Sequence, residues 1–175
     1  MTQGEVAALV QSHLSKRGIE VILSGGAAVA IYSGNAYVSK DVDRVNIYSA
    51  RGGAIKAATE EMGFREEGRY FKHPDSEVFV EFPSGPLAVG AEPVKTVDEI
   101  MLATGTLKII SPTDCVKDRL ASNSHWGDRQ ALSQAVLVAR HHQIDLQEVA
   151  RWSEAEGKGD EFQSIRSNLV STGSE

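Results

Sequence analysis

The sequence lacks the features that would cross-link the chain or place it in a membrane. Cys115 is its one cysteine, so an internal disulfide is excluded, and no cysteine and histidine spacing offers a zinc site. No stretch approaches the roughly eighteen apolar residues of a membrane-spanning helix, and the first residues lack the apolar centre of a signal peptide. We therefore expect a cytoplasmic protein that makes no membrane contact.

Positive charge is also in short supply. Lysine and arginine total 18 against 24 aspartates and glutamates, a formal net charge of −6. No global positive field attracts nucleic acid, so a polynucleotide partner would need a local patch. What is present is ordinary globular composition, with 41% hydrophobic and 24% charged residues. A length of 175 residues fits one domain, or one domain with a helical appendage.

The sequence pattern changes once, near residue 111. Residues 1–110 alternate short helical and strand-like segments, whereas residues 111–170 have helical patterns only. We expect an α+β fold with a small mixed sheet flanked by helices in the first part. The second part is expected to form a C-terminal helical bundle packed on that core, followed by a flexible tail at 171–175. Glycine, serine and charge from residue 157 onward predict that this end frays.

Individual elements follow from apolar periodicity, turn residues and capping residues. The first part predicts, in chain order, a helix near 6–14, a strand at 20–23, a short helix at 27–34, a strand at 43–48, a helix at 53–62, a hairpin of 69–72 with 77–82, and strands at 99–103 and 106–110. Residues 96–99 alternatively cap a short helix. The second part predicts helices at 112 to about 122, at 128–141 and from 145 onward. Capping residues open the first and the third, and the second has apolar residues on one face.

A glycine pair follows the first predicted strand. The segment Leu23-Ser24-Gly25-Gly26 joins that strand to a short helix, and two glycines there let backbone N–H groups approach an anion closely. The pattern is compatible with a phosphate-binding turn or with a plain tight turn. In the same way, the Ser24 hydroxyl either donates to a phosphate oxygen or caps the following helix.

Two aspartates lie at the start of the next predicted strand. Asp41 and Asp43 are two residues apart, so a strand presents both carboxylates on one face. Like charges so placed repel each other unless a cation lies between them, and Mg²⁺ favours carboxylates together with phosphate oxygens. The alternative is a solvated loop that precedes the strand.

A third acid, Glu81, lies in the apolar run Val78-Phe79-Val80-Glu81-Phe82. A carboxylate in a buried strand is costly unless it finds a partner or a metal ion, although it can also point to the wet face of the sheet. Together, the glycine pair, the two aspartates and this glutamate predict a site for a nucleoside triphosphate. Two metal ions at such a site would bind the triphosphate and activate an attacking hydroxyl.

The segments LSGGAAVAIY, SKDVDRVNI and VFVEF, in this order, resemble the nucleotidyltransferase fold superfamily. They are most similar to its small AbiEii-type and MenT-type toxin members, over roughly residues 20–140. The resemblance implies Mg²⁺-dependent transfer of a nucleoside monophosphate from an NTP such as ATP to an acceptor hydroxyl, with pyrophosphate as the leaving group. The acceptor would be RNA such as tRNA, a protein or a small molecule, and an antitoxin protein is an implied partner.

The resemblance also assigns roles to residues of this chain. It makes Asp41, Asp43 and Glu81 the catalytic and metal-binding carboxylates, with two Mg²⁺ ions. The residues it implies for nucleotide binding are Ser24, Gly25, Gly26, Lys117 and Asp128.

The sequence departs from the family pattern at Arg44, where the family usually has an apolar residue. A guanidinium at that position must reach solvent or an acid. The departure therefore raises a second hypothesis: a catalytically weak relative that binds a nucleotide or a protein partner. Metal-dependent phosphodiester hydrolysis is a third, although it does not need the glycine turn.

Overall fold

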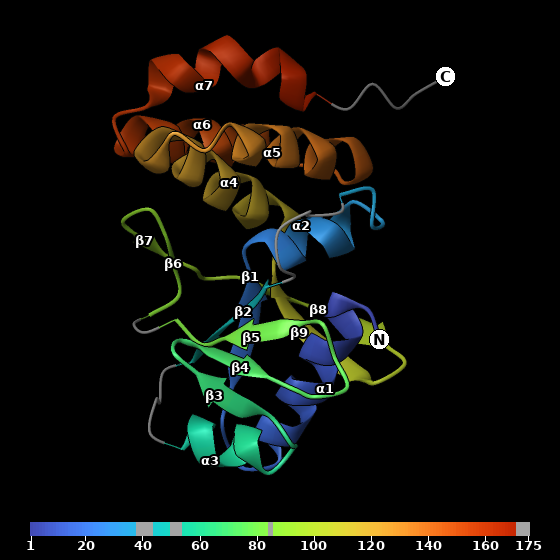
Figure 1. Ribbon diagram of the computed structural model, residues 1–175. Coiled ribbons are helices and arrows are strands. Elements are labelled where there is room, and N and C mark those ends of the chain that lie inside the picture. The colour runs from blue at the N-terminus through green and yellow to red at the C-terminus, as the bar shows by residue number, and fades with distance from the viewer. Residues whose placement is uncertain (38–43, 50–53, 84–85, 171–175) are drawn as a thin grey trace. The chain divides into compact units, whose positions relative to one another are not determined.

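The chain adopts a mixed α+β fold, which confirms the fold class expected from the sequence (Figure 1). The computed structural model describes residues 1–37, 44–49, 54–83 and 86–170. The chain divides into two compact units, each of three segments. The sheet unit consists of Met1–Ala28, Val38–Leu87 and Lys95–Ile110, and the helical unit consists of Val29–Tyr37, Ala88–Val94 and Ser111–Glu175.

The sheet unit is organised around a seven-stranded mixed sheet with the strand order β3-β4-β5-β2-β1-β9-β8. The strands are β1 (Val21–Ser24), β2 (Arg44–Ser49), β3 (Arg65–Glu67), β4 (Tyr70–Lys72), β5 (Phe79–Glu81), β8 (Val97–Leu102) and β9 (Gly105–Ile110). β1 pairs antiparallel with β2 and parallel with β9, and β2 pairs parallel with β5. The predicted hairpin forms as β4 with β5, and the two strands predicted after it pair antiparallel as β8 with β9.

Two helices of the sheet unit accompany the strands, α1 (Gln3–Ser15) and α3 (Ile55–Glu60), and a third, α2 (Gly26–Tyr32), begins in this unit and belongs to the helical unit from Val29 onward. A capping box formed by Thr2 and Glu5 opens α1. The apolar stripe of α1 is buried, and so are the apolar side chains of the central strands. The buried residues of this core include Val6, Val10 and Leu14 from the helix and Leu23, Val80, Leu107 and Ile109 from the strands. The core of the sheet unit therefore follows the periodicity visible in the sequence.

One buried side chain joins α1 to β9 by hydrogen bonds. Gln11 Nε2 donates to the carbonyl oxygen of Lys108 over 2.8 Å, and the backbone N–H of Lys108 donates to Gln11 Oε1 over 2.7 Å. The amide of Gln11 thus supplies both bonds that a neighbouring strand would supply to Lys108.

The helical unit contains α4 (Pro112–Trp126), α5 (Arg129–His141), α6 (Leu146–Ala155), α7 (Gly159–Ile165), a 3₁₀ turn η1 (Arg166–Leu169), and a short hairpin of β6 (Ala88–Val89) with β7 (Glu92–Pro93). Ser111 and Asp145 cap α4 and α6, as the sequence predicts, and Asp128 caps α5. The buried indole N–H of Trp152 donates to the carbonyl oxygen of Val89 over 3.1 Å and so fixes the hairpin to α6.

The structure corrects the expectation of a frayed end. Helix α7 and turn η1 are ordered elements, because Phe162 and Leu169 bury their side chains although glycine, serine and charge surround them in the sequence. Residues 171–175, the predicted flexible tail, lie outside the described residues. Residues 97–102 form a strand, so the alternative of a short helix capped at 96–99 is wrong. No helix within the described ranges is long and apolar enough to cross a membrane.

Candidate functional site

The predicted strand, glycine turn and helix are present at Ser24, Gly25 and Gly26. β1 ends at buried Ser24, Gly25 adopts a φ of +73°, and α2 begins at Gly26. A positive φ of this size favours glycine, which explains the first glycine of the pair. A Cβ added to Gly26 would meet no atom within 4 Å, so the second glycine is not required by packing in the structure.

The register of three adjacent strands aligns the glycine turn with Glu81. Ser24 of β1 pairs with Asn46 of β2, and Asn46 pairs with Glu81 of β5. Neighbouring strands lie about 4.8 Å apart, so the Cα atoms of Ser24 and Glu81 are separated by roughly 10 Å across β2. Asn46, which the sequence did not single out, occupies the middle of this row.

The predicted aspartate pair, Asp41 and Asp43, lies outside the described residues. The first residue of β2 is Arg44, whose Cα partner on β5 is Phe79. Of the three predicted metal-binding carboxylates, only Glu81 therefore has a described position. In the part of the chain that is described, no three histidine, cysteine, aspartate or glutamate residues are grouped so that they could hold a metal ion.

Glu81 has a cationic partner on the neighbouring strand. Its side chain is 18% exposed, and its Oε1 lies 3.6 Å from Nε of Arg69, the residue before β4. The pKa of Arg69 is raised, first by its hydrogen bond with the Tyr70 hydroxyl and then by the charge of Glu81. The structure thus gives the half-buried acid a partner, one of the alternatives that the sequence left open.

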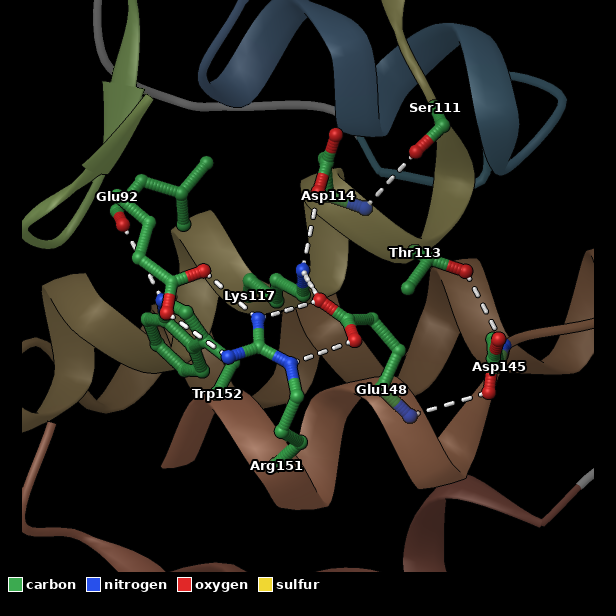
Figure 2. A network of polar contacts seen from close by, with 10 residues as sticks. Glu92, Ser111, Thr113, Asp114, Lys117, Asp145, Glu148, Arg151 and Trp152 are labelled. Atoms are coloured by element: carbon green, nitrogen blue, oxygen red, sulfur yellow. Dashed lines mark hydrogen bonds and ion pairs between the residues drawn. The ribbon is translucent and has the colours of Figure 1, made fainter. Parts of the chain in front are cut away.

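Lys117 and Asp128, the two predicted nucleotide-binding residues of the C-terminal part, belong to the helical unit. Lys117 is 6% exposed, and its Nζ lies 2.8 Å from Glu148 Oε1 and 3.3 Å from Asp114 Oδ1 (Figure 2). Asp128 caps α5 by accepting the backbone N–H groups of residues 130 and 131. Both side chains therefore have partners in the local structure.

Lys117 belongs to a chain of alternating charges, which we call the charge ladder: Lys117, Glu148, Arg151 and Glu92 (Figure 2). The Arg151 guanidinium donates to both oxygens of Glu148 at 2.6 and 2.8 Å and to both oxygens of Glu92 at 2.7 and 3.0 Å. These bonds, those from Arg151 first and that from Lys117 second, lower the pKa of Glu148 to about 2. The ladder links α4, α6 and β7.

The sequence indicates some of these ion pairs. Glu148 and Arg151 of the charge ladder are three residues apart on α6, and Lys117 is three residues from its other partner, Asp114, on α4. Side chains at this spacing meet on a helix. Glu92 lies 59 residues from Arg151 in the chain, and nothing local in the sequence indicates that contact.

Cys115 is fully buried in the first turns of α4. Removal from water raises the pKa of its thiol well above the ordinary value, and the nearby carboxylate of Asp118 acts in the same direction. The thiol is therefore a core group and not a nucleophile.

Comparison with known proteins identifies the fold. No protein-family model matches the sequence. No curated protein matches it either. A solution structure of the antibiotic-resistance factor ANT(2'')-Ia is similar, with 13% identity, coverage of 92% of this chain and 91% of that one, and a TM-score of 0.51.

Two crystal structures are also similar. ANT(2'')-Ia in complex with adenylyl-2''-tobramycin has 15% identity, coverage of 95% of this chain and 99% of that one, and a TM-score of 0.53. An antigenic nucleotidyltransferase-like protein from Paracoccidioides brasiliensis has 14% identity, coverage of 97% and 94%, and a TM-score of 0.57.

At identities this low the similarity concerns the fold alone. It confirms that the chain has a nucleotidyltransferase fold, over nearly its whole length. None of the three structures is described as AbiEii-type or MenT-type, so that finer resemblance stays a prediction.

Proposed function

We propose that the chain is a Mg²⁺-dependent nucleotidyltransferase. An acceptor hydroxyl oxygen attacks the α-phosphorus of an NTP, the bond from that phosphorus to the bridging oxygen breaks, pyrophosphate leaves, and the hydroxyl proton passes to a base. The observation that supports the proposal most directly is the row of Ser24, Asn46 and Glu81, which sets the glycine turn after β1 and a half-buried acid on β5 on the two sides of β2 in a nucleotidyltransferase fold.

In this proposal the sheet unit holds the triphosphate and the reacting groups. The turn of Ser24, Gly25 and Gly26 would bind the β- and γ-phosphates through backbone N–H groups, which the positive φ of Gly25 makes accessible. Glu81 would accept the proton of the attacking hydroxyl, directly or through a water molecule, once the substrate competes with Arg69 for it.

The metal ions belong to the same proposal. Asp41, Asp43 and Glu81 would hold Mg²⁺, because a set of carboxylate oxygens suits this hard ion. When bound, the ions neutralise charge on the triphosphate and lower the pKa of the attacking hydroxyl. Asp41 and Asp43 lie outside the described residues, so their substitution is the informative experiment.

The acceptor class is suggested by one neighbour. The crystal structure of ANT(2'')-Ia contains an adenylylated aminoglycoside, tobramycin. A small molecule with several hydroxyl groups is therefore the first acceptor to test on this chain, with tRNA and protein hydroxyl groups as the other classes.

Thermal melting with MgATP, MgCTP, MgGTP and MgUTP tests nucleotide binding. A ligand at 100 times its dissociation constant adds about 2.7 kcal/mol to the free energy of unfolding, so one of the four nucleotides should raise the melting temperature clearly. Release of labelled pyrophosphate in the presence of a mixed acceptor pool then tests transfer. Asp43→Ala should abolish the release, whereas the matched control Asp75→Ala, at an exposed loop position of the same unit, should not.

The alternative is a catalytically weak relative that binds a nucleotide or a protein partner. The ion pair of Glu81 with Arg69 favours it, because the guanidinium lies beside the carboxylate oxygen that would accept the hydroxyl proton. Under this alternative a nucleotide raises the melting temperature but no pyrophosphate is released. If Arg69→Gln then restores release, the pair itself suppresses catalysis.

The roles of Lys117 and Asp128 as nucleotide ligands are also part of the proposal. Lys117 would have to exchange Asp114 or Glu148 for a phosphate oxygen, so Lys117→Met should raise the KM for the NTP more than Lys108→Met does.

A toxin role is the last part of the proposal. It predicts that expression of the wild-type chain arrests growth and that expression of Asp43→Ala does not. A co-expressed antitoxin protein would relieve the arrest.

A further inference from the structure

The two edges of the sheet differ in a way that the proposed activity does not explain. At one edge, β3 is only three residues long and carries Arg65, Glu66 and Glu67, all exposed. Short and charged edge strands are a common protection against pairing with other chains. At the other edge, β8 is six residues long, contains neither lysine nor proline, and exposes Val97 at 38% and Met101 at 85%.

The hydrogen bonds of Gln11 show which backbone groups of β8 point outward. The N–H and C=O of Lys108 are both bound by the Gln11 side chain, so they do not face β8. The opposed pair of Glu99 and Lys108 is therefore of the non-hydrogen-bonded kind, in which the backbone groups of both residues point away from each other.

Because the two kinds of pair alternate along an antiparallel ladder, the residues two positions on either side of Glu99 behave as it does. The outward N–H and C=O groups of β8 are those of Val97, Glu99 and Met101. Within the described part of the chain, no strand follows β8 in the sheet. The edge thus offers a row of unpaired donors and acceptors in the pattern that an added strand needs.

The side chains of the same residues indicate which residue types an added strand should have. Val97, Glu99 and Met101 are the exposed positions of β8 and share one face by the period of two. Lys108, opposite Glu99, bonds to Glu20 instead, and no ion pair of Glu99 occurs among the residues described. The surface presented is therefore apolar, acidic and apolar along three alternate positions.

The geometry points to β8 as a docking edge for an extended segment of a basic partner protein. The segment adds an eighth strand, with lysine or arginine opposite Glu99 and apolar side chains opposite Val97 and Met101, since opposite charges across a strand pair attract. The formal charge of −6 on this chain favours approach of a basic partner.

A second copy of the chain fits the same edge less well. A symmetric antiparallel pairing centred on Glu99 sets two glutamates opposite each other, which is destabilising. A pairing centred on Ile100 leaves Val97 beyond the end of the other copy's strand, because β8 ends at Leu102.

Fluorescence anisotropy with synthetic peptides tests the proposal on the full chain. The probe is a labelled Thr-Val-Thr-Lys-Thr-Val-Thr peptide, and its match carries glutamate in place of lysine. The wild-type chain should bind the lysine peptide about tenfold more tightly than the glutamate peptide, and Glu99→Lys should reverse the preference. Glu77→Lys, which makes the same change of charge at an exposed position before β5, should leave it unchanged.

Two further measurements separate strand addition from charge attraction. Met101→Pro removes an outward N–H and should abolish binding, since proline is tolerated at such edge positions. A lysine peptide with alternate backbone nitrogens methylated should also fail to bind, and this control leaves the protein unaltered. The proposal is overturned if the methylated peptide binds as well as the parent. It is equally overturned if Glu77→Lys weakens binding as much as Glu99→Lys, if the two parent peptides bind alike, or if light scattering shows a dimer that Met101→Pro dissociates.

Discussion

Glu148 is held by two cations, and its ionisation is therefore tied to folding. Lys117 and Arg151 donate hydrogen bonds to its carboxylate and lower its pKa from 4.5 to about 2. A carboxyl group whose pKa is lower in the folded than in the unfolded chain stabilises the fold above its unfolded pKa. That stabilisation is lost as the pH falls from about 4.5 toward 2.

Replacing this one residue should therefore give a pH-dependent loss of stability. Because the side chain is 36% exposed, solvent screening reduces the effect, and we expect Glu148→Gln to lower the free energy of unfolding by roughly 1 kcal/mol at pH 7. Urea denaturation at pH 7, 4 and 3 should show the difference from wild type shrinking as the pH falls. Glu154→Gln, an exposed position on the same helix, is the control, and a difference that stays constant down to pH 3 would contradict the assignment.

Residue chemistry selects candidate residues for the site but not the residues that surround them. The period of two and the apolar setting single out Asp41, Asp43 and Glu81 without any structure. The partner of Glu81, Arg69, depends on the register of a hairpin. Asn46 enters the row because β2 and β5 pair in parallel across a connection of 29 residues, from 50 to 78, which a local pattern cannot specify.

At the scale of elements, the helix starts of the C-terminal part rest on single capping side chains. Ser111 Oγ accepts the backbone N–H of Asp114 over 3.1 Å, and Pro112 occupies the first helical position of α4. Ser111→Ala should lower the free energy of unfolding by about 1 kcal/mol, whereas Ser111→Asp should retain the cap. Urea denaturation checks both variants, and equal losses for the two would show that the cap is not the cause.

The contact of α1 with β9 gives a second prediction at this scale. Gln11→Leu should cost about 2 kcal/mol, because it leaves the backbone N–H and C=O of Lys108 without their partner. Gln3→Leu on the same helix is the control, since the Oε1 of Gln3 is buried without a hydrogen bond among the described residues. Faster hydrogen exchange of the Lys108 amide in Gln11→Leu alone would support the assignment, and equal exchange in both variants would contradict it.

Elements with strong end signals were predicted from sequence, and those held by distant contacts were not. Helices α4 and α6 and the hairpin of β4 with β5 appear where capping and turn residues predict them, and α5 appears where the apolar spacing predicts it. β3 consists of charged residues, and α7 begins at a glycine. Neither segment therefore has a local apolar pattern from which the element can be predicted. The short β6 and β7 depend on their contacts with α6.

At the scale of the whole molecule, the two units are interleaved in sequence. Each consists of three separate segments, so neither unit can be cut out as a continuous piece of chain. When one unit unfolds, the ends of the segments that form the other lose their anchor points. We therefore expect a single cooperative unfolding transition and not two.

The tryptophans make this expectation measurable. Trp126 and Trp152 are the two tryptophans of the chain, and both belong to the helical unit. Tryptophan fluorescence therefore reports on the helical unit, whereas far-UV circular dichroism reports on both units. The two signals should give one urea midpoint, and Gln11→Leu in the sheet unit should shift the fluorescence midpoint as well. Separate midpoints, or an unshifted fluorescence curve in that variant, would show that the units unfold independently.

The burial of Cys115 has a practical consequence for all of these experiments. Because the one native thiol is buried and its pKa is raised, maleimide dyes and thiol-specific spin labels should not react with it in the native protein. A cysteine introduced by Met101→Cys would then be the sole reactive handle, without any prior removal of the natural one. A probe attached there would report the arrival of an added strand at β8 directly.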